Sequence, residues 1–224
     1  MKGLCELLAV QPGVTAIIGG GGKTTLMLTL ARELAARGTV IVTTSTKILP
    51  PEGFPLLCNP TAEELKAALG KERAVCVGAP QAESGKLGAP SLGFAALAAL
   101  ADYVLVEADG SRGLPLKAHA DYEPVIPASA NQCIYVIGLD CLGAPLREVC
   151  HRAELFAELN GCGVNEAVTA ELVAAAVQRE KFADRYFINK ADDAEGREKA
   201  AGLAALLDRP VVIGSLRKGE YECW

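Results

Sequence analysis

The sequence has few aromatic residues, no strong excess of either charge and no long apolar run. Phe, Trp and Tyr make up 5% of the 224 residues, although half of the chain is hydrophobic. Ala, Leu, Val and Gly therefore supply most of the apolar surface, which favours close packing of helices on a sheet and argues against disorder. The net charge of −5 includes no concentrated basic stripe, so we expect no nucleic-acid partner.

Segments that would direct the chain to a membrane are also lacking. The apolar stretch 92–100 is too short to cross a bilayer. The first ten residues contain Glu6 and are followed by Gln11, Pro12 and Gly13, which argues against a cleavable signal. We therefore expect a cytoplasmic protein with no membrane contact.

The eight cysteines include no C-x-x-C pair among Cys133, Cys141, Cys150 and Cys162. A zinc site is therefore the weaker interpretation and buried free thiols are the stronger one. Cys150 lies beside His151, which keeps a metal role for this pair open. The sequence assigns no role to Cys141.

Apolar runs alternate with amphipathic segments along the whole chain. This pattern predicts an α/β fold of one domain, residues 1–224, with a doubly wound, mainly parallel sheet and helices on both faces. The expected strands are 14–18, 40–44, 74–77, 103–106, 133–137, 186–188 and 211–213. The expected helices are 24–37, a short one capped by Thr61 with Glu64 three residues on, 165–178 and 195–207. Ligands of such folds bind at the carboxyl ends of the strands.

A glycine-rich turn joins the first expected strand to the first helix. Glycines let successive N–H groups face phosphate oxygens, Lys23 would reach the terminal phosphates, and the Thr24 hydroxyl would bind Mg²⁺. The longer common form of this motif has glycine where Ile17 stands, so the match is to the short G-x-x-G-K-T form, also seen in Mur-type ligases. The seven residues predicted to bind a nucleotide are Gly19, Gly20, Gly21, Gly22, Lys23, Thr24 and Thr25.

An apolar strand ends in two carboxylates, Glu107 and Asp109. Phosphate-loop proteins need an acid at this place to hold Mg²⁺, and the two side chains share one face of an extended chain, so either could serve. Gly110 would donate its N–H to the terminal phosphate. Arg112 and Lys117 follow, and the sequence leaves open whether Arg112 acts as an internal arginine finger, whether it binds an anionic second substrate, or whether both are surface charges.

The N-K-A-D sequence at residues 189–192 follows a later expected strand. In GTPases this signature selects guanine, whose N1–H and amine donate to the aspartate. Asp192 is the expected base reader, the stem of Lys190 would lie along the purine, and Asn189 would either contact the base or brace the phosphate loop. A backbone amide of residues 214–216 could contact guanine O6. These residues favour GTP over ATP.

Seven ordered motifs together resemble one known family. They are G-G-G-G-K-T-T, T-T-S-T-K-I, V-E-A-D-G-S-R-G-L-P-L-K, E-P-V-I-P, G-L-D-C-L-G, C-H-R-A-E-L and N-K-A-D. This set is similar to the YqeC family, accessory proteins of selenium-dependent molybdenum hydroxylases that are described as acting in selenium-cofactor biosynthesis. The resemblance implies a P-loop fold and a molybdenum hydroxylase as partner. It implies no settled reaction.

Three functions remain open at this point. The first is a Mg²⁺-dependent GTPase whose hydrolysis drives a conformational switch. The second is a GTP- or ATP-dependent small-molecule kinase or ligase, which would act on a second substrate near Arg112 and Lys117. The third is a non-hydrolysing nucleotide-binding module used for assembly. The sequence also leaves a homodimer open.

Overall fold

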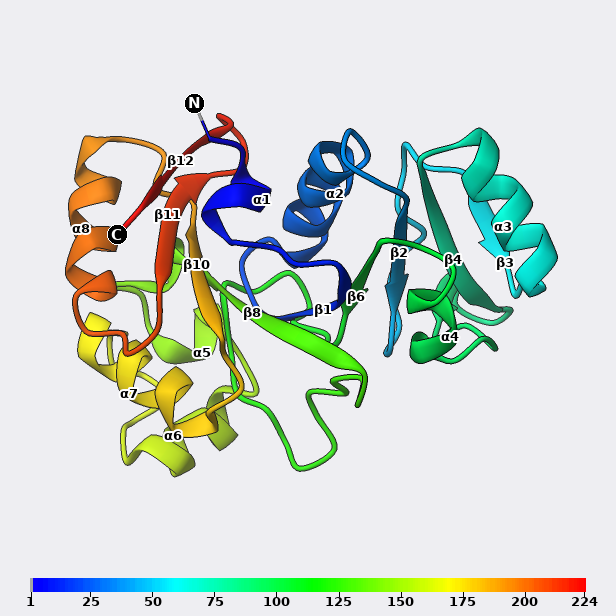
Figure 1. Ribbon diagram of the computed structural model, residues 1–224. Helices are drawn as coiled ribbons and strands as arrows, with labels where there is room; N and C mark the ends of the chain where they lie inside the picture. The colour runs from blue at the N-terminus through cyan, green and yellow to red at the C-terminus, as the bar shows by residue number, and fades with distance from the viewer. Residues whose placement is uncertain (1) are drawn as a thin grey trace. The chain divides into compact units, whose positions relative to one another are not determined.

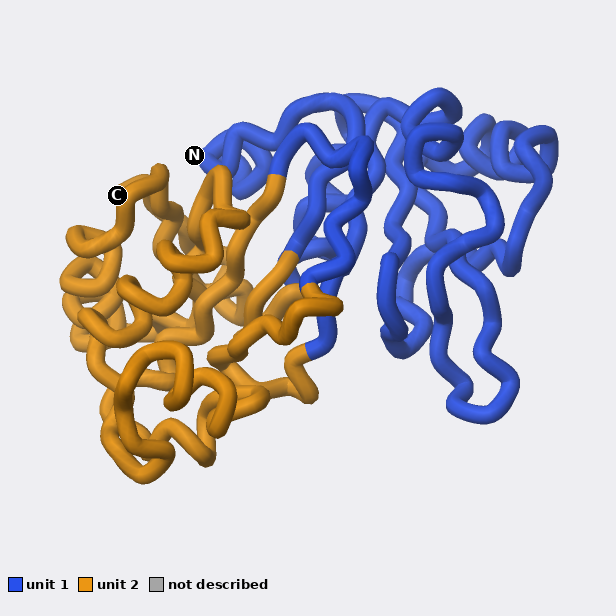
Figure 2. The backbone as a smooth tube through the Cα atoms, turned by 90° about the horizontal axis from the view of Figure 1, so that it is seen from below, with its two compact units in different colours: residues 1–17, 24–110, 124–132 blue, residues 18–23, 111–123, 133–224 orange. Residues whose placement is uncertain are grey.

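The computed structural model describes residues 2–224 and has the doubly wound, mainly parallel α/β fold that the sequence predicts (Figure 1). The chain forms two compact units, coloured separately in Figure 2. Unit 1 comprises residues 1–17, 24–110 and 124–132, and unit 2 comprises residues 18–23, 111–123 and 133–224. The sequence predicts a single domain of residues 1–224, and this stays a prediction.

The strands of unit 1 form a parallel group in the order β1-β6-β2-β4-β3, with β5 antiparallel to β4. All five residues of β2 are buried, as expected for a strand covered on both faces. The strands are β1 (Gly13–Gly19), β2 (Val40–Thr44), β3 (Leu56–Cys58), β4 (Ala74–Gln81), β5 (Lys86–Gly88) and β6 (Tyr103–Glu107); the last two residues of β1 belong to unit 2.

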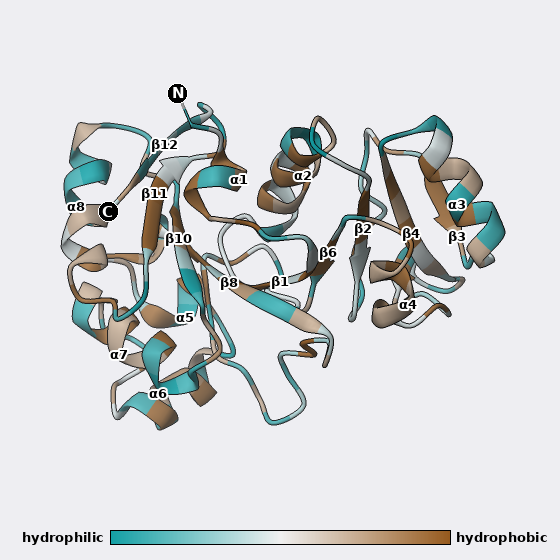
Figure 3. Cartoon of the chain, viewed as in Figure 1, coloured by the Kyte–Doolittle hydropathy of each residue, from teal (hydrophilic) through white to brown (hydrophobic). Residues whose placement is uncertain are grey.

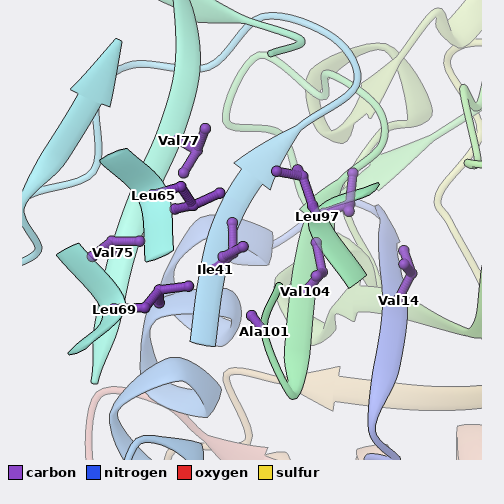
Figure 4. Packing of buried hydrophobic residues seen from close by; sticks show 10 residues of the cluster. Val14, Ile41, Leu65, Leu69, Val75, Val77, Leu97, Ala101 and Val104 are labelled. Atoms are coloured by element: carbon purple, nitrogen blue, oxygen red, sulfur yellow. The ribbon is translucent and has the colours of Figure 1, made fainter. Parts of the chain in front are cut away.

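Two helices cover one face of these strands. Leu65 and Leu69 of α3 and Leu97 of α4 pack with strand residues such as Ile41 and Val104 in one buried cluster (Figure 4). The capping box expected at Thr61 and Glu64 is present, so the start of α3 is confirmed. The helices of unit 1 are α1 (Leu4–Leu7), α2 (Lys23–Leu34, whose first residue belongs to unit 2), α3 (Ala62–Lys71) and α4 (Phe94–Ala98).

The sheet strands of unit 2 run in the order β12-β11-β10-β8, parallel except for the antiparallel strand β12. β11 is mainly hydrophobic, whereas α8 carries both hydrophilic and hydrophobic bands (Figure 3). A separate pair of short parallel strands, β7 (Leu116–Lys117) and β9 (Cys150–His151), lies in the same unit. The remaining strands are β8 (Ala130–Gly138, whose first three residues belong to unit 1), β10 (Arg185–Asn189), β11 (Val211–Ser215) and β12 (Glu220–Cys223).

The helices of unit 2 begin with a single turn η1 (Leu139–Cys141) and continue with α5 (Leu146–Val149), α6 (Ala153–Asn160), α7 (Ala170–Glu180) and α8 (Ala194–Ala204). The expected helix 165–178 begins too early, because Thr169 caps α7 by accepting the N–H of Leu172 and Ala167 forms a β-bridge with Pro145. The sequence also missed short elements, among them α1, α4, β3 and β12. No helix in residues 2–224 has the length and apolarity needed to cross a membrane.

Candidate functional site

The carboxyl ends of three parallel strands of unit 1 lie in register. Ile17 of β1 and Thr44 of β2 both stand opposite Glu107, the last residue of β6. The Thr44 hydroxyl donates a 2.8 Å hydrogen bond to the backbone oxygen of Glu107, which ties the ends of β2 and β6 together. The expected ligand edge is therefore built from neighbouring strand ends.

Thr24 and Glu107 meet at this edge. The Thr24 hydroxyl donates a 2.7 Å hydrogen bond to Oε2 of Glu107, and only 6% of Glu107 is exposed. Asp109, two residues further on, is fully buried. A hydroxyl and a carboxylate oxygen side by side are the hard oxygen ligands that Mg²⁺ prefers, so these residues fit that ion. Between the two candidate acids, Glu107 is the one whose bond to Thr24 is established.

The phosphate loop in unit 2 needs its glycines for two reasons. Gly19, Gly21 and Gly22 have φ values of +93°, +81° and +129°, which other residues adopt only with strain. A Cβ on Gly21 would also lie 2.3 Å from Cα of Gly138, at the end of β8. The loop can therefore lie against this strand end only because no side chain intervenes.

Two amides of the loop donate within the protein. The N–H of Gly20 bonds to the oxygen of Val136 at 2.9 Å, and the N–H of Gly21 bonds to the oxygen of Leu114 at 3.0 Å. The first part of the loop is thus anchored to β8 and to the segment after Gly113. This corrects the expectation that successive amides of the whole loop face a phosphate.

Lys23 lies folded into the loop, with only 4% of the residue exposed. Its Nζ donates to the oxygen of Gly19 at 2.7 Å and to Oγ of Ser111 at 3.2 Å. The sequence reasoning did not single out Ser111. The only feature of the sequence that could have indicated Ser111 is its hydroxyl directly after Gly110, at the end of the acidic motif.

Asn189 braces the phosphate loop, which is one of the two roles that the sequence left open. Its Nδ2 donates to the oxygen of Gly21 at 2.7 Å, and its Oδ1 accepts the N–H of Leu216 at 3.1 Å. The residue is 5% exposed, and a Cβ on Gly22 would lie 2.5 Å from Nδ2. Both ends of the amide are therefore used inside unit 2.

The side chains of Asp192 and Lys190 make contacts nearer to solvent. Asp192 accepts from the Ser215 hydroxyl at 2.5 Å and from Nη2 of Arg217 at 2.9 Å. Lys190 pairs with Asp140 at 2.6 Å. Of the amides expected near guanine O6, that of Leu216 donates to Asn189, and Gly214 and Ser215 are the last two residues of β11.

The two cations after the acidic motif differ in their surroundings. Arg112 is exposed and has a φ of +53°, in the left-handed region. The Lys117 side chain is fully buried and forms an ion pair with Glu123, which also accepts from Arg152 at 2.6 Å. The interpretation of Lys117 as a surface charge is therefore wrong, because β7 carries this residue into the interior.

The cysteine positions favour structural thiols. All eight cysteines are free, and burial raises the pKa of both Cys141 and Cys150 to about 12. A thiol with so high a pKa stays protonated at neutral pH, as expected for a buried structural side chain. Across residues 2–224, no group of three or more His, Cys, Asp or Glu is placed to hold a metal ion.

Comparison with known proteins assigns the chain to a family. The model of the YqeC family, described as "YqeC protein", matches residues 15–154. The chain belongs to the YqeC family. It is 38% identical over 162 residues to the uncharacterized protein YqeC of Escherichia coli (strain K12), a match that covers 67% of this chain and 62% of the relative.

The family match covers both the phosphate loop and the acidic strand end, whereas the N-K-A-D motif lies beyond it. Among solved structures, the chain is similar to the 54 kDa protein of the signal recognition particle from Aeropyrum pernix K1, determined in complex with GDP. That similarity has a TM-score of 0.49 at 18% identity and covers 96% of this chain and 44% of the other. A similarity of this degree carries no information on function.

Proposed function

We propose that the protein binds a Mg²⁺-nucleoside triphosphate at the phosphate loop and hydrolyses it, with GTP preferred over ATP. The observation that carries this proposal is the 2.7 Å hydrogen bond from Thr24 to Glu107 at aligned strand ends. In phosphate-loop proteins, a hydroxyl of the loop and an acid at a strand end hold the magnesium ion. When bound, this ion neutralises charge on the phosphate oxygens.

The phosphates would be held by the end of the loop and by Lys23. Gly20 and Gly21 use their amides within the protein, so this role falls to the segment from Gly22 to Thr25 at the start of α2. The N-terminus of a helix favours an anion because its first amides lack partners inside the helix. Lys23 would exchange Ser111 for a phosphate oxygen, and Gly110 would donate its N–H to the terminal phosphate.

The preference for guanine rests on Asp192. Its present partner Arg217 has a side chain that is 76% exposed, and an ion pair this exposed contributes only about 0–1 kcal/mol. Guanine can therefore displace Arg217 at low cost and donate to the same carboxylate. Lys190 would lie along the purine ring after leaving Asp140, to which it is bound by a similarly exposed pair.

The biological role that we propose follows from the family. The resemblance of the motifs implies an accessory protein that acts in the maturation of selenium-dependent molybdenum hydroxylases. Nucleotide hydrolysis would drive a change between two states of the loop after Asp109, and the partner enzyme would respond to that state. The structure contributes the link from Lys23 to Ser111, because a phosphate that takes over Lys23 also releases Ser111.

A competition panel tests the nucleotide and the base together. Calorimetry with Mg²⁺ and GTP, ATP or their diphosphates is run on the wild type, Lys23→Ala and Asp192→Ala. We expect the wild type to bind GTP more tightly, Lys23→Ala to lose binding of both triphosphates, and Asp192→Ala to lose only the preference. Absence of nucleotide binding by the wild type would refute the proposal, and an ATP-selective wild type would refute the guanine assignment.

A kinase or ligase is the second candidate, and the exposure of Arg112 directly after Ser111 favours it. An arginine at this position can hold an anionic acceptor as readily as it can stabilise hydrolysis. Phosphate release measured with and without small acids separates the two functions. Turnover that strictly requires a small acceptor favours group transfer, whereas turnover by the protein alone favours the GTPase.

A further inference from the structure

A cluster of positive charge lies in unit 2 outside the nucleotide residues proposed above. Strands β7 and β9 pair in parallel, and their register sets Lys117 opposite His151. Arg152 follows His151 directly, and both Lys117 and Arg152 bind the carboxylate of Glu123. Within this cluster the Lys117 side chain is buried, while His151 and Arg152 are partly exposed to solvent.

The charges of this cluster do not balance. Burial lowers the pKa of His151 most, the charges of Arg152, Lys117 and Arg112 lower it further, and the carboxylate of Glu123 raises it. Burial opposes ionisation of Glu123, but its hydrogen bonds with Arg152 and Lys117 outweigh this effect and hold its pKa below the ordinary value. Two cations, Lys117 and Arg152, thus share one carboxylate, and the charge of Arg112 also acts on His151, in a protein whose net charge is negative.

Arg152 is held in place with donors to spare. Its Nη1 bonds to Glu123 and to the oxygen of Ala118 at 3.3 Å, and its Nη2 bonds to the Tyr122 hydroxyl at 3.1 Å. The guanidinium also lies 5.2 Å from the centre of the Tyr122 ring. These bonds account for three of the five N–H groups that an arginine carries. A guanidinium fixed in this way is ready to bind an oxyanion without further ordering.

We propose that His151 and Arg152, beside the buried ion pair of Lys117 and Glu123, form a binding site for a small molecule that carries a phosphate or carboxylate group, with the charge of Arg112 adding to its attraction for the anion. The excess positive charge attracts the anion, and the imidazole of His151 gains a proton when the anion offsets the neighbouring cations. Arg112 follows Ser111, whose hydroxyl accepts a hydrogen bond from Lys23. The proposal does not depend on nucleotide binding, because none of its residues belongs to the phosphate loop.

The two histidines of the chain supply a direct readout. His119 is buried and bound to Glu180 at 2.8 Å, so it serves as an internal control for His151. The imidazole NMR signals are followed against pH, without nucleotide, in inorganic phosphate, in sodium acetate and in sodium chloride of the same ionic strength. We expect phosphate, acetate or both to raise the pKa of His151 relative to chloride and to leave His119 unchanged. A response to phosphate alone assigns a phosphoryl group, and a response to acetate alone assigns a carboxylate.

Variants locate the response. Arg152→Gln should weaken binding of the active anion about tenfold, as expected for loss of one charged hydrogen bond. Arg209→Gln, an exposed arginine of the same unit, should bind as the wild type does. Lys23→Ala should keep the response of His151, because the site is separate from the phosphate loop. A response equal to that in chloride, an unchanged affinity in Arg152→Gln, or loss of the response in Lys23→Ala would each overturn the proposal.

Discussion

The residues proposed to hold phosphate and metal and those proposed to hold the base present their polar groups differently. Lys23, Glu107 and Asn189 are at most 6% exposed, and each is bound to a backbone group or a hydroxyl. Asp192 and Lys190, by contrast, have side chains that are 33% and 38% exposed and pair with arginine or aspartate at the surface.

This difference in burial determines how much free energy each polar group loses when it exchanges its partner for a ligand. A buried polar group that loses its partner costs about 1–3 kcal/mol, whereas an exposed ion pair contributes about 0–1 kcal/mol. Exchanging a partner therefore costs more free energy at the phosphate and metal residues, where we propose it for Lys23 alone, than at the base residues, which can change partners when a ligand binds. Substitutions in the first set should affect both stability and binding, and those in the second should affect selectivity alone.

The largest effect is expected from Gly21→Ala. The new Cβ would lie 2.3 Å from Cα of Gly138, and the position has a φ of +81°. We expect a loss of about 2–4 kcal/mol in the free energy of unfolding, measured in urea, because overpacking and a strained backbone act together. Nucleotide binding should be lost as well.

Gly202→Ala is the matched control. Gly202 lies in α8 of the same unit, where an added Cβ meets nothing within 4 Å. Alanine in a helix interior should therefore stabilise the protein by about 0.5–1 kcal/mol. If Gly21→Ala were tolerated as well as Gly202→Ala, the loop would not be fixed against β8.

The next largest effect is expected on the Mg²⁺ affinity of the variant Glu107→Gln. This variant removes the carboxylate that accepts the Thr24 hydroxyl. Even indirect partners of a metal ion contribute about 10–100-fold to its affinity, so we expect at least that loss in titrations of Mg²⁺ with nucleotide present. Asp109→Asn is the comparison, and a larger loss in Asp109→Asn would identify Asp109 as the metal acid instead.

Asn189→Ala should have a smaller effect that still reaches both stability and binding. It would leave the Gly21 oxygen and the Leu216 amide without their present partner. We expect a loss of about 1–3 kcal/mol in urea unfolding and weaker binding of GTP and ATP alike. Asn189→Asp should fare no better, because a carboxylate cannot donate to the Gly21 oxygen. A variant Asn189→Asp with wild-type stability would contradict the bracing role.

The sequence predicted the parts of the site that lie within one motif. Gly19–Thr25, the acids at the end of β6 and the N-K-A-D run each stand at the end of a strand that a run of apolar residues marks. Partners distant in the chain could not be predicted in this way. Lys23 and Ser111 are 88 residues apart, and nothing in a local pattern pairs them. The sequence left a surface position for Lys117 open, and the structure instead buries it where β7 pairs with β9.

The missed elements have a similar cause. β12 has the sequence E-Y-E-C and is mostly exposed, so it lacks the apolar run that marks the other strands. Its hydrogen bonds depend on β11, which a single-segment pattern does not include. The helix α1 has only four residues, too few for a helical period to appear. Regular burial was therefore predictable, and edge strands and single turns were not.

The smallest effect is expected at the exposed ion pair of Arg217 and Asp192. Arg217→Ala removes the cation that occupies one oxygen of Asp192 in the absence of ligand. Because an exposed pair contributes about 0–1 kcal/mol, stability should hardly change and GTP affinity should rise by up to about fivefold. ATP affinity should stay the same, since adenine has no donor pair for this carboxylate, and Arg209→Ala should change neither. If Arg217→Ala weakened GTP and ATP equally, Arg217 would be a ligand of the phosphates rather than a competitor of guanine.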